Sequence, residues 1–196
     1  INGVSAKGKT TEEVSKVLKG QPNTSVSILL HRPYLDTSFE VTFNREKVSV
    51  ASVPYSKYLE QGVAYIRLRS FTRNCANDLK NAIIELKKEK DLKGLILDLR
   101  NNPGGLLNES VDVVNLFVEK GEEIVSTKGK IKAWDKSYVA TKTPLDTEVP
   151  LVVLINSSSA SASEIVSGAI QDLDRGVVIG QRSYGKGLVQ QTRKLS

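Results

Sequence analysis

Residues 150–190 constrain the fold of this chain more than any other stretch. They begin with five apolar residues, Leu151 to Ile155, which lie between a proline and a polar turn. A short apolar run with such boundaries indicates a buried strand. Apolar residues then recur at helical spacing from Ala162 to Leu173, and a second apolar run follows at Val177 to Ile179. The stretch therefore predicts a strand, a helix and another strand.

The preceding residues show the same alternation. Two further strands are expected at Ala64–Leu68 and Gly94–Leu99, and apolar stripes predict helices around Leu79–Leu86 and Leu107–Val118. Strands that alternate with helices are typical of a largely parallel sheet. We therefore predict an α/β domain over residues 48–196.

Residues 123–148 interrupt this alternation. A short strand is expected at Glu123–Ser126. The polar run from Lys128 to Glu148, which contains the only tryptophan, Trp134, predicts an exposed excursion from the domain.

Residues 1–47 form a separate first block. Thr10 or Thr11 can cap a short helix, and alternating apolar residues predict strands at Val26–Leu30 and Phe39–Phe43. These elements are too few to bury a core of their own. We expect this block to be the later part of a module that begins before the first residue, in a chain that is a processed or excised piece.

Composition excludes several classes of function. The chain has 28 lysine and arginine residues against 22 aspartate and glutamate residues, but the two signs are interspersed, which is typical of solvated surfaces. Only 6% of residues are aromatic, so we do not expect nucleic-acid binding. No apolar run approaches the ~20 residues of a membrane helix. The single cysteine, Cys75, offers neither a disulfide nor a metal site, and we expect an ordinary residue at a helix start.

Ser161 lies where the predicted strand gives way to a helix. That junction carries free backbone N–H groups and the positive end of the helix dipole, which would stabilise an alkoxide or oxyanion. The same residues, Ser161 to Glu164, also have the spacing of a capping box, in which the serine bonds forward and the glutamate bonds back. The local pattern leaves both interpretations open.

The segment DLRNNPGG, residues 98–105, follows the predicted strand Gly94–Leu99. Its adjacent glycines, Gly104 and Gly105, would let backbone N–H groups approach a ligand, and strand ends of this kind are where α/β folds place ligands. A plain strand-to-helix turn that needs positive φ explains the glycines equally well.

Residues 180–187 nearly match a phosphate-binding P-loop, but two features argue against nucleotide binding. Gly187 replaces the serine or threonine that ligates magnesium, and Leu188 to Thr192 look like a strand, whereas a P-loop must open a helix there. The pair Ser183 and Lys186 has β-lactamase spacing, but Gly185 argues against the helix that such a pair needs.

A serine nucleophile at this position needs a base. The only histidine, His31, lies in the first block, so we discount a histidine triad. A lysine can serve if desolvation disfavours its ammonium form. Lys186 lies between two glycines and precedes apolar residues, and the amide of Gln190 can hold its amine in line with Ser161.

Three segments together resemble the carboxyl-terminal processing proteases, also called tail-specific proteases, of peptidase family S41. They are DLRNNPGG, the serine-rich segment Ser159–Glu164 and the YGKG loop Tyr184–Gly187, in the family's order and spacing. The resemblance covers essentially all 196 residues. It implies a crotonase-like (ClpP/crotonase) catalytic domain over residues 48–196 and the later half of a PDZ domain over residues 1–47.

The resemblance also implies roles for individual residues. Ser161 would be the nucleophile, Lys186 the general base and Gln190 the residue that orients the lysine. Backbone N–H groups of Gly104 or Gly105 and of Ala162 would form the oxyanion hole. Glu164 would support the site or only cap the helix, and no metal, nucleotide or other cofactor is implied.

The implied function is a serine endopeptidase that cleaves proteins near their C-termini through an acyl-enzyme, in an extracytoplasmic compartment such as the periplasm or cell envelope. Its partners would be protein or peptide substrates bound by their C-terminal tails. One alternative is a non-catalytic scaffold that binds tails or assembles with copies of itself. Another is a crotonase-like acyl-CoA enzyme, which would leave Lys186 without a task.

The resemblance also implies segments of both domains outside this chain. The first PDZ strands and the carboxylate-binding loop should precede Ile1, and closing strands should follow Ser196, so we expect weakened or lost PDZ-gated tail recognition. Homo-oligomerisation and membrane association through segments outside this chain are left open.

Overall fold

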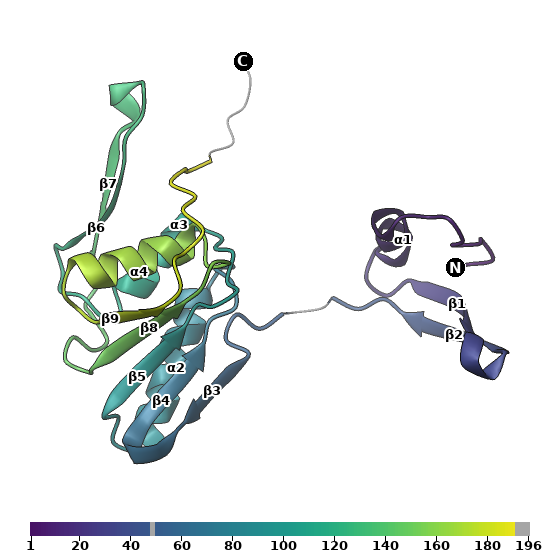
Figure 1. Cartoon of the computed structure of the whole chain (residues 1–196), viewed down its shortest axis with the longest axis horizontal. Helices are drawn as coiled ribbons and strands as arrows, with labels where there is room; N and C mark the ends of the chain where they lie inside the picture. Colours follow the sequence, from purple (N-terminus) through teal and green to yellow (C-terminus); the bar gives the residue numbers. More distant parts are fainter. Residues whose placement is uncertain (48–49, 191–196) are drawn as a thin grey trace. The chain divides into compact units, whose positions relative to one another are not determined.

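The computed structural model describes residues 1–47 and 50–190, and the predicted start of the catalytic domain at Val48 lies outside these ranges (Figure 1). The chain divides into two compact units, Ile1–Val50 and Ala51–Ser196.

The first unit contains one helix and one hairpin. Helix α1 (Thr11–Leu18) begins at the N-cap Thr10, which forms a capping box with Glu13. Strands β1 (Ser25–Arg32) and β2 (Thr37–Asn44) pair antiparallel around the 3₁₀ turn η1 (Pro33–Leu35). The predicted helix and both predicted strands are confirmed.

This unit has very little core. Among its described residues Val26 is the single buried side chain, and apolar residues of the hairpin such as Leu29 are exposed to solvent. The expectation that the block cannot bury a core of its own is therefore confirmed.

The second unit is built on a five-stranded mixed sheet in the order β3-β4-β5-β8-β9. Strands β4, β5, β8 and β9 run parallel, as the alternation of strands and helices predicts, and β3 adds an antiparallel edge that the sequence pattern did not reveal. The five strands are β3 (Tyr55–Tyr58), β4 (Val63–Arg67), β5 (Gly94–Asp98), β8 (Leu151–Ile155) and β9 (Val177–Gly180).

Three helices cover one face of this sheet: α2 (Cys75–Glu89), α3 (Leu107–Val114) and α4 (Ala162–Asp172). One buried cluster joins them to the sheet, and it includes Ile83 of α2, Val113 of α3, Ile170 of α4 and Leu97 of β5. Because strand side chains alternate between faces, neighbouring strand residues such as Tyr65 and Ile96 point away from the helices and are less buried. The core therefore lies between the sheet and the helices, and it fixes the start of α4.

The helix predicted to reach Val118 ends earlier. The N–H groups of Leu116 and Phe117 donate to the carbonyls of Val113 and Val114, three residues back, so the last turn tightens and leaves the α-helix. The 3₁₀ turn η2 (Glu60–Gly62) precedes β4.

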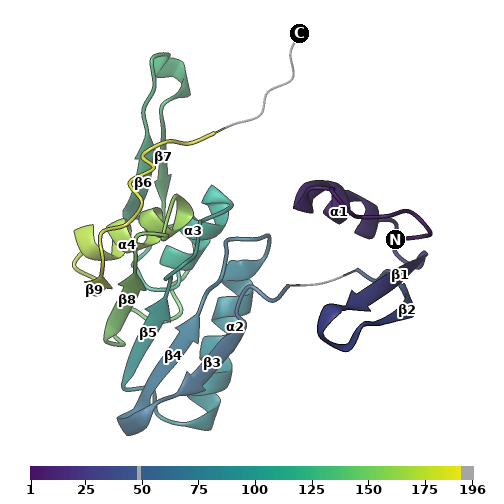
Figure 2. The same ribbon diagram turned by 45° about the vertical axis from the view of Figure 1, so that its right-hand side comes forward.

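The predicted excursion is an ordered hairpin. Strand β6 (Glu123–Thr127) pairs antiparallel with β7 (Lys136–Val139), and the 3₁₀ turn η3 (Lys132–Trp134) lies near its tip. The hairpin projects away from the five-stranded sheet in both views (Figures 1 and 2). Exposure is confirmed for the tip, but the expectation is wrong for parts of the segment beyond β7, because Ala140 is buried in the core and Leu145 packs against it.

The strand predicted at Leu188–Thr192 is not formed as far as Gln190, and its last two residues lie outside the described ranges. Residues 188–190 are not helical either, whereas a P-loop opens a helix at this position. Across the described ranges, no helix combines the length and the apolar character needed to cross a bilayer.

Candidate active site

Asn102 ties the turn after β5 to the start of α4. Its side chain is fully buried, donates to the carbonyl of Leu68 at 2.9 Å and accepts a hydrogen bond from the N–H of Gly104 at 2.9 Å. Its own carbonyl accepts from the N–H of Ala160 at 3.1 Å and from the hydroxyl of Ser163 at 2.9 Å. Two segments that are far apart in sequence are thereby held against each other.

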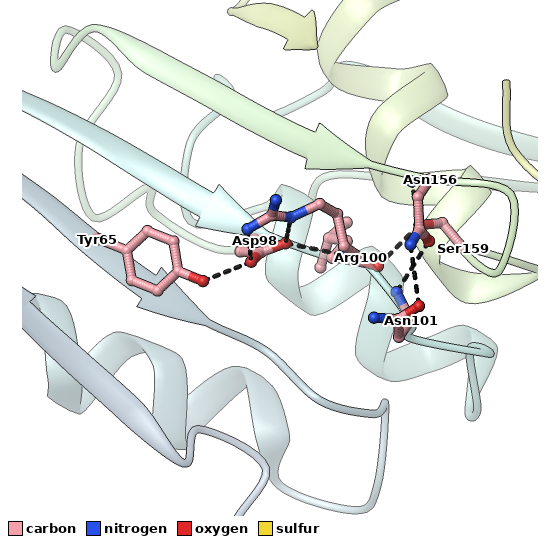
Figure 3. Close-up of polar contacts among 7 residues, drawn as sticks. Tyr65, Asp98, Arg100, Asn101, Asn156 and Ser159 are labelled. Carbon is pink, nitrogen blue, oxygen red and sulfur yellow. Dashed lines mark hydrogen bonds and ion pairs between the residues drawn. The ribbon is translucent and has the colours of Figure 1, made fainter. Parts of the chain in front are cut away.

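A second set of contacts joins the same two segments (Figure 3). The hydroxyl of buried Ser159 donates to the carbonyl of Leu99 at 2.8 Å and accepts from the N–H of Asn156 at 3.0 Å. Asn156 also exchanges hydrogen bonds with Asn101. Ser159 and Ser163 of the serine run therefore have a structural task, because their hydroxyl groups hold the two segments together.

The DLR part of the turn forms an ion pair between the buried Asp98 and the exposed Arg100. The Arg100 guanidinium donates to both oxygens of Asp98, at 2.9 and 2.8 Å, and the Tyr65 hydroxyl donates to the same carboxylate (Figure 3). Burial disfavours the charged form of Asp98, but the hydrogen bonds from Arg100 and Tyr65 outweigh it and lower the pKa of Asp98. This cluster fixes the end of β5 and lies outside the cleft described below.

Gly104 and Gly105 are required by close packing. A Cβ atom on Gly104, which has φ of 99°, would lie 2.8 Å from Cβ of Ser161 and 2.9 Å from the backbone nitrogen of Ala162. A Cβ atom on Gly105 would lie 2.3 Å from the carbonyl oxygen of Phe71. A side chain on Gly104 would therefore push the turn away from Ser161, and a side chain on Gly105 would push it away from Phe71.

The backbone N–H of Gly104 is already used by Asn102. The N–H groups of Gly105 and Ala162 are therefore the better candidates for an oxyanion hole. Of the two glycines that the sequence left as alternatives, only Gly105 lines the cleft described below.

Ser161 is the N-cap of α4 and has an unusual backbone conformation. Its φ of 56° and ψ of −113° lie in a region that residues other than glycine rarely adopt. Such strain costs on the order of 1–3 kcal/mol and persists only where surrounding contacts enforce it. The predicted capping box with Glu164 is present, and it supplies part of that enforcement.

Glu164 does more than cap the helix. Its carboxylate accepts hydrogen bonds from the N–H of Ser161 at 2.7 Å, from the N–H of Lys186 at 3.1 Å, and also from the N–H of Gly185 and the hydroxyl of Ser183. Burial alone would raise the pKa of Glu164, but these hydrogen bonds to the ionised form outweigh it and lower that pKa. One carboxylate thus holds the backbones of both candidate catalytic residues.

A cleft of about 860 Å³ opens over the start of α4. It brings together the predicted residues Gly105, Ser161, Ala162, Lys186 and Gln190, and Glu164 also lines it. One wall is residues 123–126 of β6, and the floor is the outward face of α4. The cleft is long enough to hold an extended peptide, since the two ends of this floor, Ser161 and Asp172, are separated by three turns of helix.

The residues that the sequence analysis discounted lie elsewhere. His31 is on β1 of the first unit, where its ring contacts the hydroxyl of Ser38 at 3.2 Å. Cys75 begins α2 as predicted, and burial together with the charge of Glu109 raises the pKa of its thiol to about 12, which makes it inert. Within residues 1–47 and 50–190, no group of three or more histidine, cysteine or acidic side chains is placed to hold a metal ion.

Sequence reasoning missed three parts of the site. The paired asparagines before Pro103 were a signal for Asn102, because a buried asparagine can satisfy backbone groups on both of its sides. The link from Glu164 to the Lys186 loop and the wall formed by β6 depend on long-range packing, for which the local pattern gave no signal.

The chain matches known proteins over most or all of its length. The model of the family described as "Peptidase family S41" matches residues 62–196. Curated relatives named "Probable CtpA-like serine protease" are 40% identical in Staphylococcus aureus strain COL and 39% identical in Staphylococcus saprophyticus. Each alignment covers 99% of this chain but 38% of the relative, so the chain spans well under half the length of these relatives.

Solved structures show the same likeness. The photosystem II D1 C-terminal processing protease superposes with a TM-score of 0.67 at 33% identity, over 100% of this chain and 53% of that protein. A putative S41 protease from Bacteroides fragilis superposes with a TM-score of 0.61 over 94% of this chain and 53% of that one, but at 16% identity this likeness concerns the fold alone.

Replacing Asn102 tests whether the buried link between the turn and α4 stabilises the second unit. Asn102→Ala removes two side-chain hydrogen bonds and leaves the Leu68 carbonyl and the Gly104 N–H without these partners. At 1–3 kcal/mol for each of these two buried groups, we expect a loss of about 2–6 kcal/mol in the free energy of unfolding. Urea denaturation measures it. Asn108→Ala, an exposed change on α3, should stay within about 0.5 kcal/mol, and equal stability of both variants would contradict the assignment.

The pH dependence of stability tests the charge of Glu164. Because folding lowers its pKa below the ordinary value of 4.5, the ionised carboxylate stabilises the folded state above that pH, and the contribution disappears as the pH falls through the lower folded-state pKa. We therefore expect Glu164→Gln to cost about 2 kcal/mol near neutral pH and progressively less in acid.

Chemical denaturation at several pH values gives this difference. The matched control is Glu85→Gln, which changes a largely exposed glutamate on α2 and should have little effect near neutral pH. A cost for Glu164→Gln that stays constant down to strongly acidic pH would show that the carboxylate charge has no such role.

Proposed function

This chain belongs to peptidase family S41, and we propose that it carries the catalytic site of a serine endopeptidase that cleaves protein substrates near their C-termini. The observation that supports this most directly is the position of Glu164. Its carboxylate accepts hydrogen bonds from the N–H groups of Ser161 and Lys186 and thereby holds the two residues near each other. Both residues line one cleft, together with Gly105 of the close-packed glycine turn.

The proposed reaction begins with attack of Ser161 Oγ on the scissile carbonyl. Lys186, in its neutral form, takes the hydroxyl proton and later passes it to the leaving amine, so that an acyl-enzyme and a free amine result. A water molecule then attacks the acyl-enzyme, with Lys186 again as the base, and restores the serine. The Gln190 side-chain amide would orient the lysine amine through a hydrogen bond.

The negative charge of each tetrahedral intermediate would lie between the N–H groups of Gly105 and Ala162. Both residues line the cleft beside Ser161, and Ala162 is the first residue of α4, where the helix dipole is positive. Preorganised donors of this kind contribute about 3–4 kcal/mol each to lowering the barrier.

The finer architecture is part of the same proposal. We assign a crotonase-like fold to the second unit and the later part of a PDZ-like domain to the first, and we expect the whole protein to recognise the C-terminal tails of its substrates in an extracytoplasmic compartment. The likeness to a C-terminal processing protease over all of this chain supports the proposal. A non-catalytic scaffold or an acyl-CoA enzyme would leave the strained Ser161 and the held Lys186 without a task.

The proposal predicts that Ser161→Ala and Lys186→Ala each abolish peptide cleavage while the protein stays folded. Measurements belong on the longer protein that contains this chain, with a fluorogenic peptide as substrate and circular dichroism to establish folding. Matched controls are Ser158→Ala, in the same serine run, and Lys120→Ala, an exposed lysine before β6. Each control should retain turnover. Turnover retained by either folded active-site variant would refute the assignment of that residue.

A further inference from the structure

The tip of the β6–β7 hairpin, residues 128–136, has a composition that the proposed peptidase function does not require. It carries four lysines and one aspartate, which give a formal charge of +3. Two large apolar side chains lie among these charges, and both are open to solvent: Ile131 is 46% exposed and Trp134 is 55% exposed. The tip is also the part of the hairpin that lies farthest from the sheet (Figures 1 and 2).

The conformation of this tip is set by its own hydrogen bonds. The N–H of Gly129 donates to the Asp135 carboxylate at 2.8 Å, and the N–H of Trp134 donates to the carbonyl of Ile131 at 3.0 Å. The 3₁₀ turn spans Lys132–Trp134, and Ile131 is the N-cap residue that directly precedes it. The two exposed apolar side chains therefore lie within one short turn, with lysines before and after them in the chain.

We propose that this tip binds the surface of a membrane that contains anionic lipids. Tryptophan favours the boundary between headgroups and acyl chains, and lysines near a negatively charged leaflet are attracted to it. At the usual strength of this attraction, each lysine tightens binding about fivefold. The tip thus combines a shallow apolar anchor with positive charge on one small surface.

Other classes of partner fit less well. A stable protein interface buries about 800 Å² on each side, far more than two apolar side chains provide. Binding of single-stranded nucleic acid relies on several stacked aromatic rings, whereas the tip has one tryptophan.

Binding through this tip would also hold the cleft close to the membrane surface. Residues 123–126 of the same strand, β6, line the cleft beside Ser161. Ile131 is five residues beyond Ser126, a distance of at most ~17 Å at 3.3 Å per residue. If the chain is the peptidase proposed above, on which this inference rests, its substrates are polypeptide segments close to a membrane surface.

The single tryptophan makes the proposal directly measurable. Since Trp134 is the only tryptophan of the chain, its fluorescence reports on the hairpin tip alone. We expect vesicles of phosphatidylcholine with phosphatidylglycerol to shift its emission to shorter wavelength and brominated lipid in them to quench it. Pure phosphatidylcholine vesicles should have a much smaller effect, and high salt should reverse the shift.

Lysine variants separate the contribution of the hairpin tip to vesicle binding from that of the overall positive charge of the chain. Lys128→Gln combined with Lys130→Gln should weaken vesicle binding about 25-fold in co-sedimentation, at fivefold for each lysine. This pair leaves the contacts of Lys132 with Asp135 and of Lys136 with Tyr138 in place. The matched control, Lys57→Gln with Lys80→Gln, removes two exposed lysines outside the hairpin and should bind as the unmodified chain does.

Three results would overturn the proposal. They are an emission spectrum that vesicles leave unchanged, equal binding to neutral and anionic vesicles, and equal losses in the hairpin and control pairs. A shift caused by a soluble polyanion such as heparin, with none caused by vesicles, would instead assign the tip to an acidic macromolecule. Vesicle binding does not require turnover, so Ser161→Ala should bind vesicles unchanged, and this keeps failure of the hairpin proposal distinct from failure of the peptidase assignment.

A separate measurement of peptide cleavage tests whether the tip holds the cleft close to the membrane. The unmodified protein should cleave a peptide tethered to anionic vesicles faster than the same peptide in solution, and the hairpin pair of substitutions should remove the advantage. Equal rates for both peptides, with vesicle binding intact, would overturn the predicted substrate class.

Discussion

The site depends on close contact between a glycine turn and the first residue of a helix. Gly104 packs against Ser161 so tightly that no side chain fits between them, and buried Asn102 ties the turn to the segment just before α4. This contact places the Gly105 and Ala162 backbones beside the serine. It depends in turn on the parallel pairing of β5 with β8, which brings the ends of both strands to the same edge of the sheet.

Glu164 supplies the electrostatic part of the arrangement. A carboxylate that accepts several N–H and O–H hydrogen bonds stays ionised. The donors to Glu164 come from Ser161 at the start of α4 and from the loop that carries Lys186. The strained backbone of Ser161 and the loop of Lys186 are therefore fixed by one charge. The site requires a folded second unit, because α4 and the loop after β9 meet only when the sheet is complete.

Much of this architecture was predictable, because it depends on local patterns. Apolar runs at Leu151–Ile155 and Gly94–Leu99 gave two central strands, and the spacing of apolar residues after Ser161 gave α4. The antiparallel edge β3 was not predictable, since its four residues, Tyr55–Tyr58, are mostly exposed and lack a clear alternation. The preference for Gly105 over Gly104 as a candidate oxyanion-hole donor depends on one hydrogen bond, from the backbone N–H of Gly104 to the side-chain oxygen of Asn102, and no sequence pattern specifies such a bond.

A crystal structure of the longer protein with a peptide boronate bound would test the central claim most directly. A serine nucleophile forms a tetrahedral adduct with boron, which mimics the intermediate. We predict an adduct on Ser161 Oγ, with one boronate oxygen ~3 Å from the N–H groups of Gly105 and Ala162 and with Lys186 Nζ within ~3 Å of Oγ. An adduct on a different residue, or a Lys186 amine that points out of the cleft in the adduct, would contradict the account.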